Sequence, residues 1–205
     1  MALSTALMTV FLLLFSVVAH EYAHGWMAEK CGDDTARAMG RLTFNPLPHI
    51  DIIGSIVLPM ACIMLGTPVI AWAKPVPVDP NRFNNPRMDI VKVGLAGPVA
   101  NIVVAVAFSL VLWVLPIRDS ITKLLYETFN MGLYINLILA VFNMLPIPPL
   151  DGSKVVSGFL PYNLAMRYLS LEQYGFIAVF AMLYLGWINT YLTVTAGFLY
   201  RLLVP

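Results

Sequence analysis

Two histidines and a glutamate lie close together in residues 20 to 24, which read His20-Glu21-Tyr22-Ala23-His24. On a helix, positions four residues apart share one face, so His20 and His24 can bind the same metal ion. Glu21 lies between them, where its carboxylate can take a proton from a water on that metal. This spacing is typical of a metal-dependent hydrolase.

A plainer interpretation makes these three residues polar groups at the point where a membrane helix meets water. Residues 2 to 19, which precede them, carry no charge. Ionisable groups at the end of such a run are costly unless they face a cavity or a partner, and they are functional candidates by default. The metal site is therefore the favoured hypothesis.

A catalytic zinc site usually has three protein ligands and leaves one position for water, so the two histidines need a third ligand. Asp151 is the candidate, because it is the first charged residue after the uncharged stretch 128 to 150. Pro146, Pro148 and Pro149 break that stretch, and the turn would let the carboxylate project sideways into a cavity. The alternative is that Asp151-Gly152 forms an ordinary turn at a membrane exit.

The composition places these residues in a membrane protein. The 205 residues are 60% hydrophobic and 11% charged, with a mean hydropathy of +0.81, whereas globular domains carry about a quarter charged residues. This excludes an ordinary soluble fold and a disordered chain. A formal net charge of +1, without a basic cluster, also argues against nucleic-acid binding. The two cysteines are too few for a disulfide framework.

Five uncharged stretches are long enough to cross a bilayer, which takes roughly 20 residues of helix. They are residues 2 to 19, 52 to 73, 93 to 117, 128 to 150 and 173 to 200. The first has no Lys or Arg before it, which argues against a secretory signal. The first, third and fifth are expected to be simple spans. The second contains Gly54, Pro59, Gly66 and Pro68, whose backbone breaks must be shielded from lipid.

The metal site itself constrains the topology, because Asp151 must reach the depth of the two histidines. The chain satisfies this if a re-entrant segment near residues 50 to 73 enters and leaves on one side, with about four spanning helices around it. Loop charges agree, since nine of the 12 Lys and Arg then lie on the cytoplasmic side. The three on the opposite side are Arg118, Lys123 and Arg201. The sequence thus predicts an active site near the cytoplasmic face.

The re-entrant segment is rich in β-branched residues at 52 to 53, 55 to 58 and 69 to 72, which suit short strands. An extended substrate could add a strand there, although ordinary helix packing remains an alternative. His49 precedes this segment. It is either a solvated loop histidine or a gating or auxiliary residue near the metal.

Three motifs together resemble the site-2 protease family of intramembrane zinc metalloproteases. Residues 20 to 24 match HExxH, residues 143 to 152 match NxxPxxPLDG, and residues 97 to 101 match a Gly-Pro-x-x-Asn element between the two. Their order and placement agree with the family pattern. The chain lacks the PDZ and CBS domains that some relatives carry, and it resembles a minimal catalytic core.

The resemblance implies a role for each motif residue. His20, His24 and Asp151 match the zinc ligands, and Glu21 matches the general base. Asn143 matches a polar residue that helps to hold the substrate or the developing oxyanion. The family also implies a small membrane-embedded sheet near residues 50 to 73.

The sequence as a whole predicts one all-α polytopic membrane domain over residues 1 to 205, acting as a zinc endopeptidase. Its expected partners are the lipid bilayer and transmembrane protein substrates, cut within or near a membrane helix. The alternative is a metal-binding membrane protein without peptidase activity, such as a transporter or a degenerate protease relative. The presence of Glu21 argues against it, because metal binding does not need this carboxylate.

Overall fold

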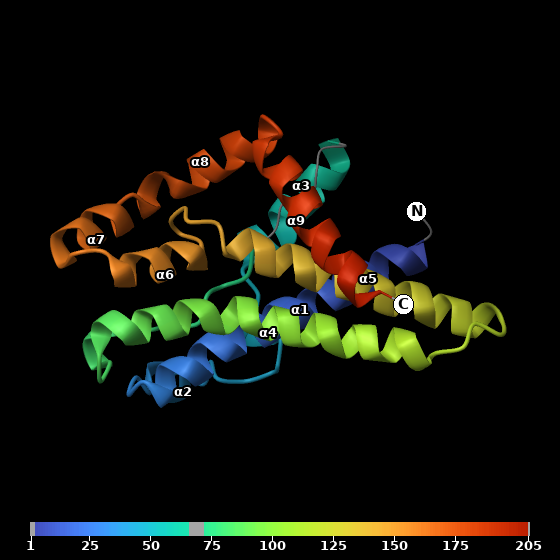
Figure 1. The fold of residues 1–205 in the computed structure, drawn as a ribbon, viewed down its shortest axis with the longest axis horizontal. Helices are drawn as coiled ribbons and strands as arrows, with labels where there is room; N and C mark the ends of the chain where they lie inside the picture. The colour runs from blue at the N-terminus through green and yellow to red at the C-terminus, as the bar shows by residue number, and fades with distance from the viewer. Residues whose placement is uncertain (1–2, 66–71, 205) are drawn as a thin grey trace.

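Three long helices form the centre of the molecule in the computed structural model, which describes residues 3 to 65 and 72 to 204. They are α1 (Leu3–Lys30), α4 (Pro86–Val114) and α5 (Ser120–Asn143). Helix α4 packs against both of the others (Figure 1). A buried apolar cluster, including Leu112, Leu133 and Leu137, joins α4 to α5 and to the C-terminal helix.

Side-chain caps begin two of the long helices. Asn85 accepts a hydrogen bond from Met88 N at the start of α4, and Pro86 occupies the first helical position, where its missing N–H is tolerated. Asp119 and Thr122 form a capping box at the start of α5. Residues 144 to 150, with their three prolines, form turns rather than helix, as expected where proline removes a backbone donor.

These three helices are long and apolar enough to span a membrane, and a bent pair of helices could form a fourth span. Helix α8 (Glu172–Tyr184) meets α9 (Trp187–Leu203) at 78°. The expectation of a simple span over residues 173 to 200 is therefore wrong. Gly186 lies at the bend with φ of 80°, a left-handed conformation that glycine adopts readily and that ends a helix.

The segment after residue 50 is helical rather than extended. A π-helical turn, η2 (Ile52–Val57), leads into α3 (Leu58–Leu65), so the prediction of strands at 52 to 58 is wrong. Asp51 caps this turn by accepting from Gly54 N at 2.7 Å, and this local contact outweighs β-propensity. The described residues contain no strand. Most of the third predicted strand, at 69 to 71, lies outside them.

The chain returns to where this segment began. Trp72 N donates to Gly54 O at 3.1 Å, and Lys74 N donates to His49 O at 2.9 Å. Residues 74 to 79, here called the strap, then run without helix toward the short turn η3 (Pro80–Arg82). Two further short elements, α2 (Thr35–Ala38) and η1 (Leu47–His49), lie between α1 and η2.

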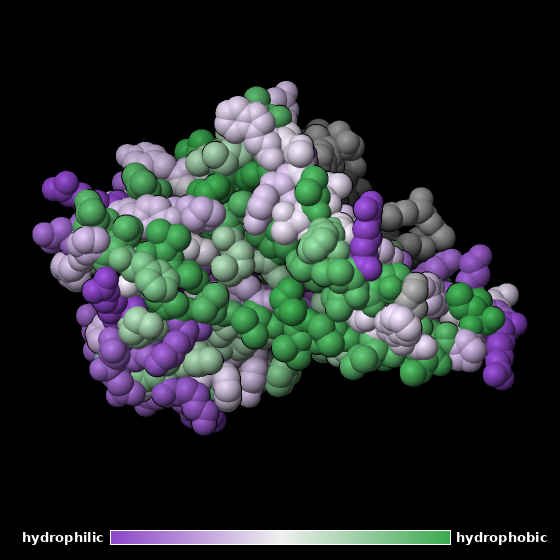
Figure 2. Space-filling model, viewed as in Figure 1, coloured by the Kyte–Doolittle hydropathy of each residue, from purple (hydrophilic) through white to green (hydrophobic). Residues whose placement is uncertain are grey.

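The loop of prolines after α5 leads into α6 (Asp151–Phe159) and then α7 (Tyr162–Leu169). Helix α6 packs against α4, which brings its first residue toward α1. On the face seen in Figure 2, hydrophilic residues gather at the two ends of the bundle and an apolar region lies between them. This distribution matches the expectation of a protein embedded in a bilayer.

Candidate metal centre

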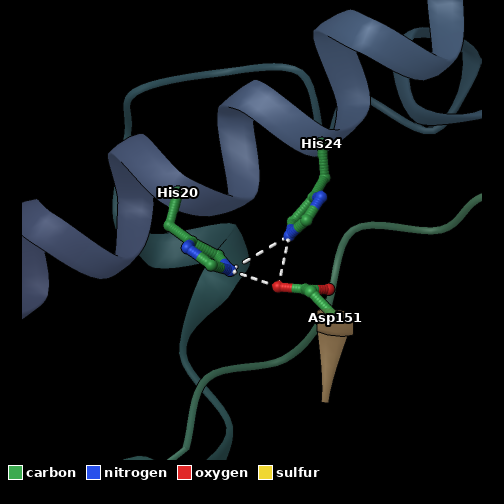
Figure 3. A group of neighbouring side chains, drawn as sticks. All are labelled: His20, His24 and Asp151. Atoms are coloured by element: carbon green, nitrogen blue, oxygen red, sulfur yellow. Dashed lines mark hydrogen bonds and ion pairs between the residues drawn. The ribbon is translucent and has the colours of Figure 1, made fainter. Parts of the chain in front are cut away.

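His20, His24 and Asp151 come together at one point between the helices (Figure 3). Asp151 Oδ2 lies 3.0 Å from His20 Nε2 and 3.1 Å from His24 Nε2, and the two Nε2 atoms are 3.0 Å apart. All three residues are buried, with 7%, 5% and 5% of their surface exposed. Residues 127 positions apart and more thus form a single cluster of metal-ligating atoms.

Helix α4 leaves room for the two imidazoles because it has a glycine opposite them. A Cβ atom on Gly97 would lie 2.3 Å from His24 Nε2 and 2.5 Å from His20 Cε1. Such distances are far inside van der Waals contact, so any side chain at this position would displace the rings. The first contribution of the Gly-Pro-x-x-Asn element to the site is therefore the absence of a side chain at Gly97, which leaves space for the two imidazoles.

The same helix holds both rings by their Nδ1 atoms. His24 Nδ1 donates to Val93 O and His20 Nδ1 donates to Asn101 Oδ1, each at 2.6 Å. A carbonyl oxygen can only accept, so each ring carries a proton on Nδ1. In the neutral ring, each Nε2 then presents a lone pair to the centre of the cluster. Metal-bound histidines are usually held by a hydrogen bond to the other ring nitrogen in this way.

The donor set fits a zinc ion. Two neutral imidazole nitrogens and a carboxylate oxygen are among the usual zinc ligands, and ligands about 2.0 to 2.1 Å from a tetrahedral ion lie roughly 3.3 Å from one another. The 3.0 to 3.1 Å separations seen here are close to that value. When both imidazoles are neutral and the carboxyl is ionised, the three lone pairs that converge here repel one another, and a shared cation would remove that repulsion.

Asp151 is oriented from the side away from the histidines. Lys154, one turn further along α6, donates from Nζ to Asp151 Oδ1 at 2.9 Å. This contact occupies one carboxylate oxygen and leaves Oδ2 to face the two rings. Sequence reasoning did not assign this role to Lys154, although the i,i+3 spacing on a short helix was a usable signal.

Glu21 lies beside the cluster and is held from a different part of the chain. Its Oε2 accepts a hydrogen bond of 2.7 Å from the backbone N–H of Val76, in the strap. Arg41, itself buried, holds the strap by donating from Nη2 to Lys74 O at 2.9 Å and to Pro75 O at 3.1 Å. This hydrogen bond uses one of the two carboxylate oxygens.

Comparison with known proteins gives the family. The sequence model described as "Peptidase family M50" matches residues 8 to 194. The chain is 37% identical over 187 residues to the "Putative zinc metalloprotease YwhC" of Bacillus subtilis, covering 89% of this chain and 82% of that protein. The chain belongs to peptidase family M50. The resemblance to the site-2 proteases, drawn from three motifs, is therefore confirmed.

Other relatives of this M50 peptidase agree. The chain is 29% identical to the "Putative zinc metalloprotease Rip2" of Mycolicibacterium smegmatis, over 83% of this chain and 64% of that protein. It is 40% identical to the MJ0611 protein of Methanocaldococcus jannaschii, described in the same words, over 43% of this chain and 44% of that protein. No solved structure matches the chain. The protein is thus an integral membrane zinc metalloendopeptidase of the site-2 type.

Two other candidate residues of the M50 peptidase lie outside the ligand cluster. Asn143 is the last residue of α5, and its Nδ2 donates to Leu139 O at 3.0 Å within that helix. Its suggested role toward substrate stays a prediction. His49 is fully buried, and its Nε2 donates to Thr43 O at 3.0 Å. The interpretation of His49 as a solvated loop residue is therefore wrong, because its side chain is shielded from solvent.

Proposed function

We propose that this peptidase cleaves membrane proteins within or near their transmembrane helices, with zinc held by His20, His24 and Asp151. One observation carries the proposal: three ligand atoms converge at 3.0 to 3.1 Å inside a bundle of helices long enough to span a bilayer. His20 lies ten residues before Lys30 in α1, or about 15 Å at 1.5 Å per residue. That distance favours a site below the membrane surface, on the side where α1 ends.

Glu21 is the proposed general base. When bound, zinc supplies Lewis-acid polarisation of the scissile carbonyl and lowers the pKa of the attacking water. Val76 N–H holds Glu21 Oε2, and we assign Oε1 to take the proton from that water. The carboxyl then passes the proton to the amine that leaves. This carboxylate also favours a peptidase over a metal transporter, because metal binding and transport do not require a general base beside the ligands.

Asn143 is the proposed contact for the substrate carbonyl. One hydrogen of its amide is used on Leu139 O, and the second can donate to a carbonyl oxygen as negative charge develops there. The residue ends α5, and the proline turns that follow lead directly to Asp151. A transmembrane helix hides its own carbonyls in hydrogen bonds, so the substrate must unwind locally to reach these groups.

The proposed topology has residues 50 to 73 as a re-entrant segment and the active site near the cytoplasmic face. The hydrogen bond from Lys74 N to His49 O supports a return to the same side, because it joins the two ends of the segment. The distribution of Lys and Arg supports the orientation. Reporter fusions after residues 41 and 118 would test it, since the two positions should report opposite sides of the membrane.

Replacing Glu21 by glutamine tests the assignment of the base. We expect zinc content to remain unchanged and cleavage to fall roughly 10²- to 10⁴-fold, because the amide cannot take the proton. The assay would use the full chain in liposomes with single-span reporter substrates that the wild-type protein cuts. Asp151→Ala provides the complementary control, in which zinc content should fall. Turnover retained by Glu21→Gln would remove the base from the mechanism, and unchanged zinc in Asp151→Ala would remove the third ligand.

A further inference from the structure

Asn136 is a buried amide at a place where the sequence gives no reason for one. It lies in the middle of α5, within the uncharged stretch 128 to 150, and belongs to none of the three motifs. Its exposed surface is 0%. A polar side chain buried in a membrane helix is retained at a free-energy cost unless all its groups find partners. Its partners therefore show what it is for.

Every polar atom of this amide has a partner on a different segment or on its own helix. Asn136 Nδ2 donates to Ser16 Oγ and to Gly132 O, both at 2.8 Å. Asn136 Oδ1 accepts from Asn101 Nδ2 at 2.9 Å. Asn101 Oδ1 in turn accepts from His20 Nδ1. A continuous chain of hydrogen bonds thus runs from α1 through α5 and α4 to a metal-ligating histidine.

The direction of each bond in this chain follows from its far end. Ser16 Oγ donates to Leu12 O at 2.7 Å, and because that carbonyl can only accept, the hydroxyl has no hydrogen left for Asn136. Asn136 must therefore turn its NH₂ toward Ser16, an orientation that Gly132 O also requires. Its oxygen is then left to face Asn101.

The remaining steps are equally determined. Asn101 must present its NH₂ to Asn136 Oδ1, and it uses the second hydrogen on Ser16 O at 3.2 Å. Its oxygen consequently faces His20 Nδ1, which must carry a proton. In the neutral ring, which is the form that binds a metal, His20 Nε2 is left with a lone pair directed at Asp151 and His24. A flipped Asn101 would offer hydrogens to Nδ1 and would move the ring proton to Nε2, where zinc binds.

We propose that Asn136 is a positioning residue for the metal centre, which fixes the orientation of the Asn101 amide and so keeps His20 Nε2 available to zinc. The inference rests on the proposed function, in which His20 is a zinc ligand. Ser16 and the carbonyl of Leu12, both in α1, hold the far end of this series of hydrogen bonds. No bulk water reaches these buried amides to correct their orientation, so side chains must do so.

Zinc affinity of the purified full chain, measured by competition with a chelator, tests this role without using activity. In Asn136→Leu we expect the affinity to fall about 10-fold, near the lower end of the roughly 10- to 100-fold loss caused by removing a direct partner of a ligand. Asn130→Leu is the matched control. It lies on the same helix and its Oδ1 accepts from Tyr200 OH at 2.7 Å, away from the histidines.

The control separates positioning from general stability. Both variants lose a buried or partly buried interhelical hydrogen bond, so both should lower the melting temperature, but only Asn136→Leu should weaken zinc binding. If that variant does not fold, Ser16→Ala replaces it, because it removes one acceptor from Asn136 and should weaken zinc binding by a smaller factor. Unchanged zinc affinity in a folded Asn136→Leu, or failing that in Ser16→Ala, would overturn the proposal.

His20→Ala in the same assay distinguishes this failure from failure of the proposed function. It should abolish high-affinity zinc binding whether or not Asn136 acts on the site. If His20→Ala binds zinc as the wild-type protein does, His20 is not a ligand and both proposals fall. If only the Asn136 and Ser16 variants bind normally, the ligand assignment stands and the positioning role is wrong.

Discussion

The two histidines of the proposed metal site and the proposed base are neighbours in sequence, but different parts of the molecule hold them. The rings of His20 and His24 are fixed by acceptors on α4, inside the helix bundle. Glu21 is fixed by the backbone N–H of Val76, in a strap that joins two helices. The first support is made of spanning helices and buried amides, and the second is a loop segment held by Arg41.

This difference implies that zinc binding and proton transfer can be changed separately. Damage to the helix bundle should lower zinc affinity and with it activity. Damage to the strap should lower activity while zinc remains bound. A single rigid frame for both functions would instead make every variant lose the two together, and variants of the two supports can distinguish these cases.

Gly97→Ala should have the largest effect, because it acts on the ligands directly. The new methyl carbon would lie 2.3 Å from His24 Nε2 and 2.5 Å from His20 Cε1, so the rings or α4 must move. We expect zinc affinity to fall by more than the roughly 10- to 100-fold that follows loss of an outer partner. Chelator competition on the purified protein would measure it.

Gly197→Ala is the matched control for this prediction. Gly197 also lies within a helix, α9, and a Cβ there meets nothing within 4 Å. It should bind zinc as tightly as the wild-type protein. If Gly97→Ala also retains normal zinc binding, the close approach of α4 to the imidazoles does not shape the site. The claim that the helix bundle controls zinc binding would then be wrong.

The residues of the cluster could be predicted because ionisable groups are rare in this sequence. With 11% charged residues, a pair of histidines at i and i+4 and an aspartate after a long uncharged run are conspicuous. Helix geometry relates His20 to His24. The demand for a third ligand then selected Asp151, and the structure brings its Oδ2 within 3.1 Å of both rings. Three of the spanning helices followed from length and hydropathy.

The supports of the site could not be predicted in the same way. Asn136 contacts residues 35 and 120 positions away, and no local spacing reveals such partners. The donor to Glu21 is a backbone N–H, which every residue except proline possesses. The residue type at position 76 therefore does not predict this contact. Asn101 belongs to the Gly-Pro-x-x-Asn motif, but its contact with His20 Nδ1 forms only when α1 and α4 pack together.

Two predictions about the fold, the strands after residue 50 and the simple span over 173 to 200, were wrong because the same residue types favour more than one local structure. The β-branched residues after position 50 favoured strands, but the Asp51 side chain begins a helical turn there instead. The stretch 173 to 200 contains three glycines, of which Gly175 and Gly197 lie inside helices and only Gly186 takes positive φ. Sequence alone does not distinguish a glycine that permits close packing from one that bends the chain.

Arg41→Leu tests the strap and should have an intermediate effect. The guanidinium donates to the carbonyls of Lys74 and Pro75, next to the residue that holds Glu21. If the loss of these hydrogen bonds lets the strap move and raises the activation free energy of cleavage by about 1.4 kcal/mol, turnover should fall roughly 10-fold. Zinc affinity should not change. Reporter cleavage in liposomes and chelator competition would measure the two quantities on one preparation.

Arg37→Leu provides the comparison for this variant, because Arg37 is exposed and pairs with Glu29 rather than with the strap. Its turnover and its zinc affinity should both match those of the wild-type protein. A parallel loss of zinc and turnover in Arg41→Leu would mean that strap and ligands form one mechanical unit.

Asp33 anchors the far end of the strap, and its replacement should have the smallest effect, seen mainly in the dependence of stability on pH. The carboxylate is fully buried, and its Oδ2 accepts from Asp79 N at 2.7 Å while Oδ1 accepts from Thr35 N at 3.0 Å. Burial raises the pKa of Asp33, but the hydrogen bonds from Thr35 and Asp79 lower it by more, so the net pKa lies below its usual value.

A carboxyl whose pKa is lower in the folded state stabilises the fold above its unfolded pKa of about 3.9, and this contribution is lost as the pH falls through the folded value. Asp33→Asn should therefore be less stable than the wild-type protein by about 1 kcal/mol at pH 7, and the difference should stay constant down to about pH 5 and shrink below about pH 4. Melting curves in detergent, with a chelator in every sample so that zinc release does not contribute, would measure it.

Asp34→Asn is the control, because Asp34 is an exposed neighbour of Asp33 and pairs with Arg82. This variant should differ less from the wild-type protein at every pH. A gap between the Asp33 variant and the wild-type protein that persists unchanged at pH 3 would mean that the lost stability comes from packing, and that the strap does not depend on this carboxylate being ionised.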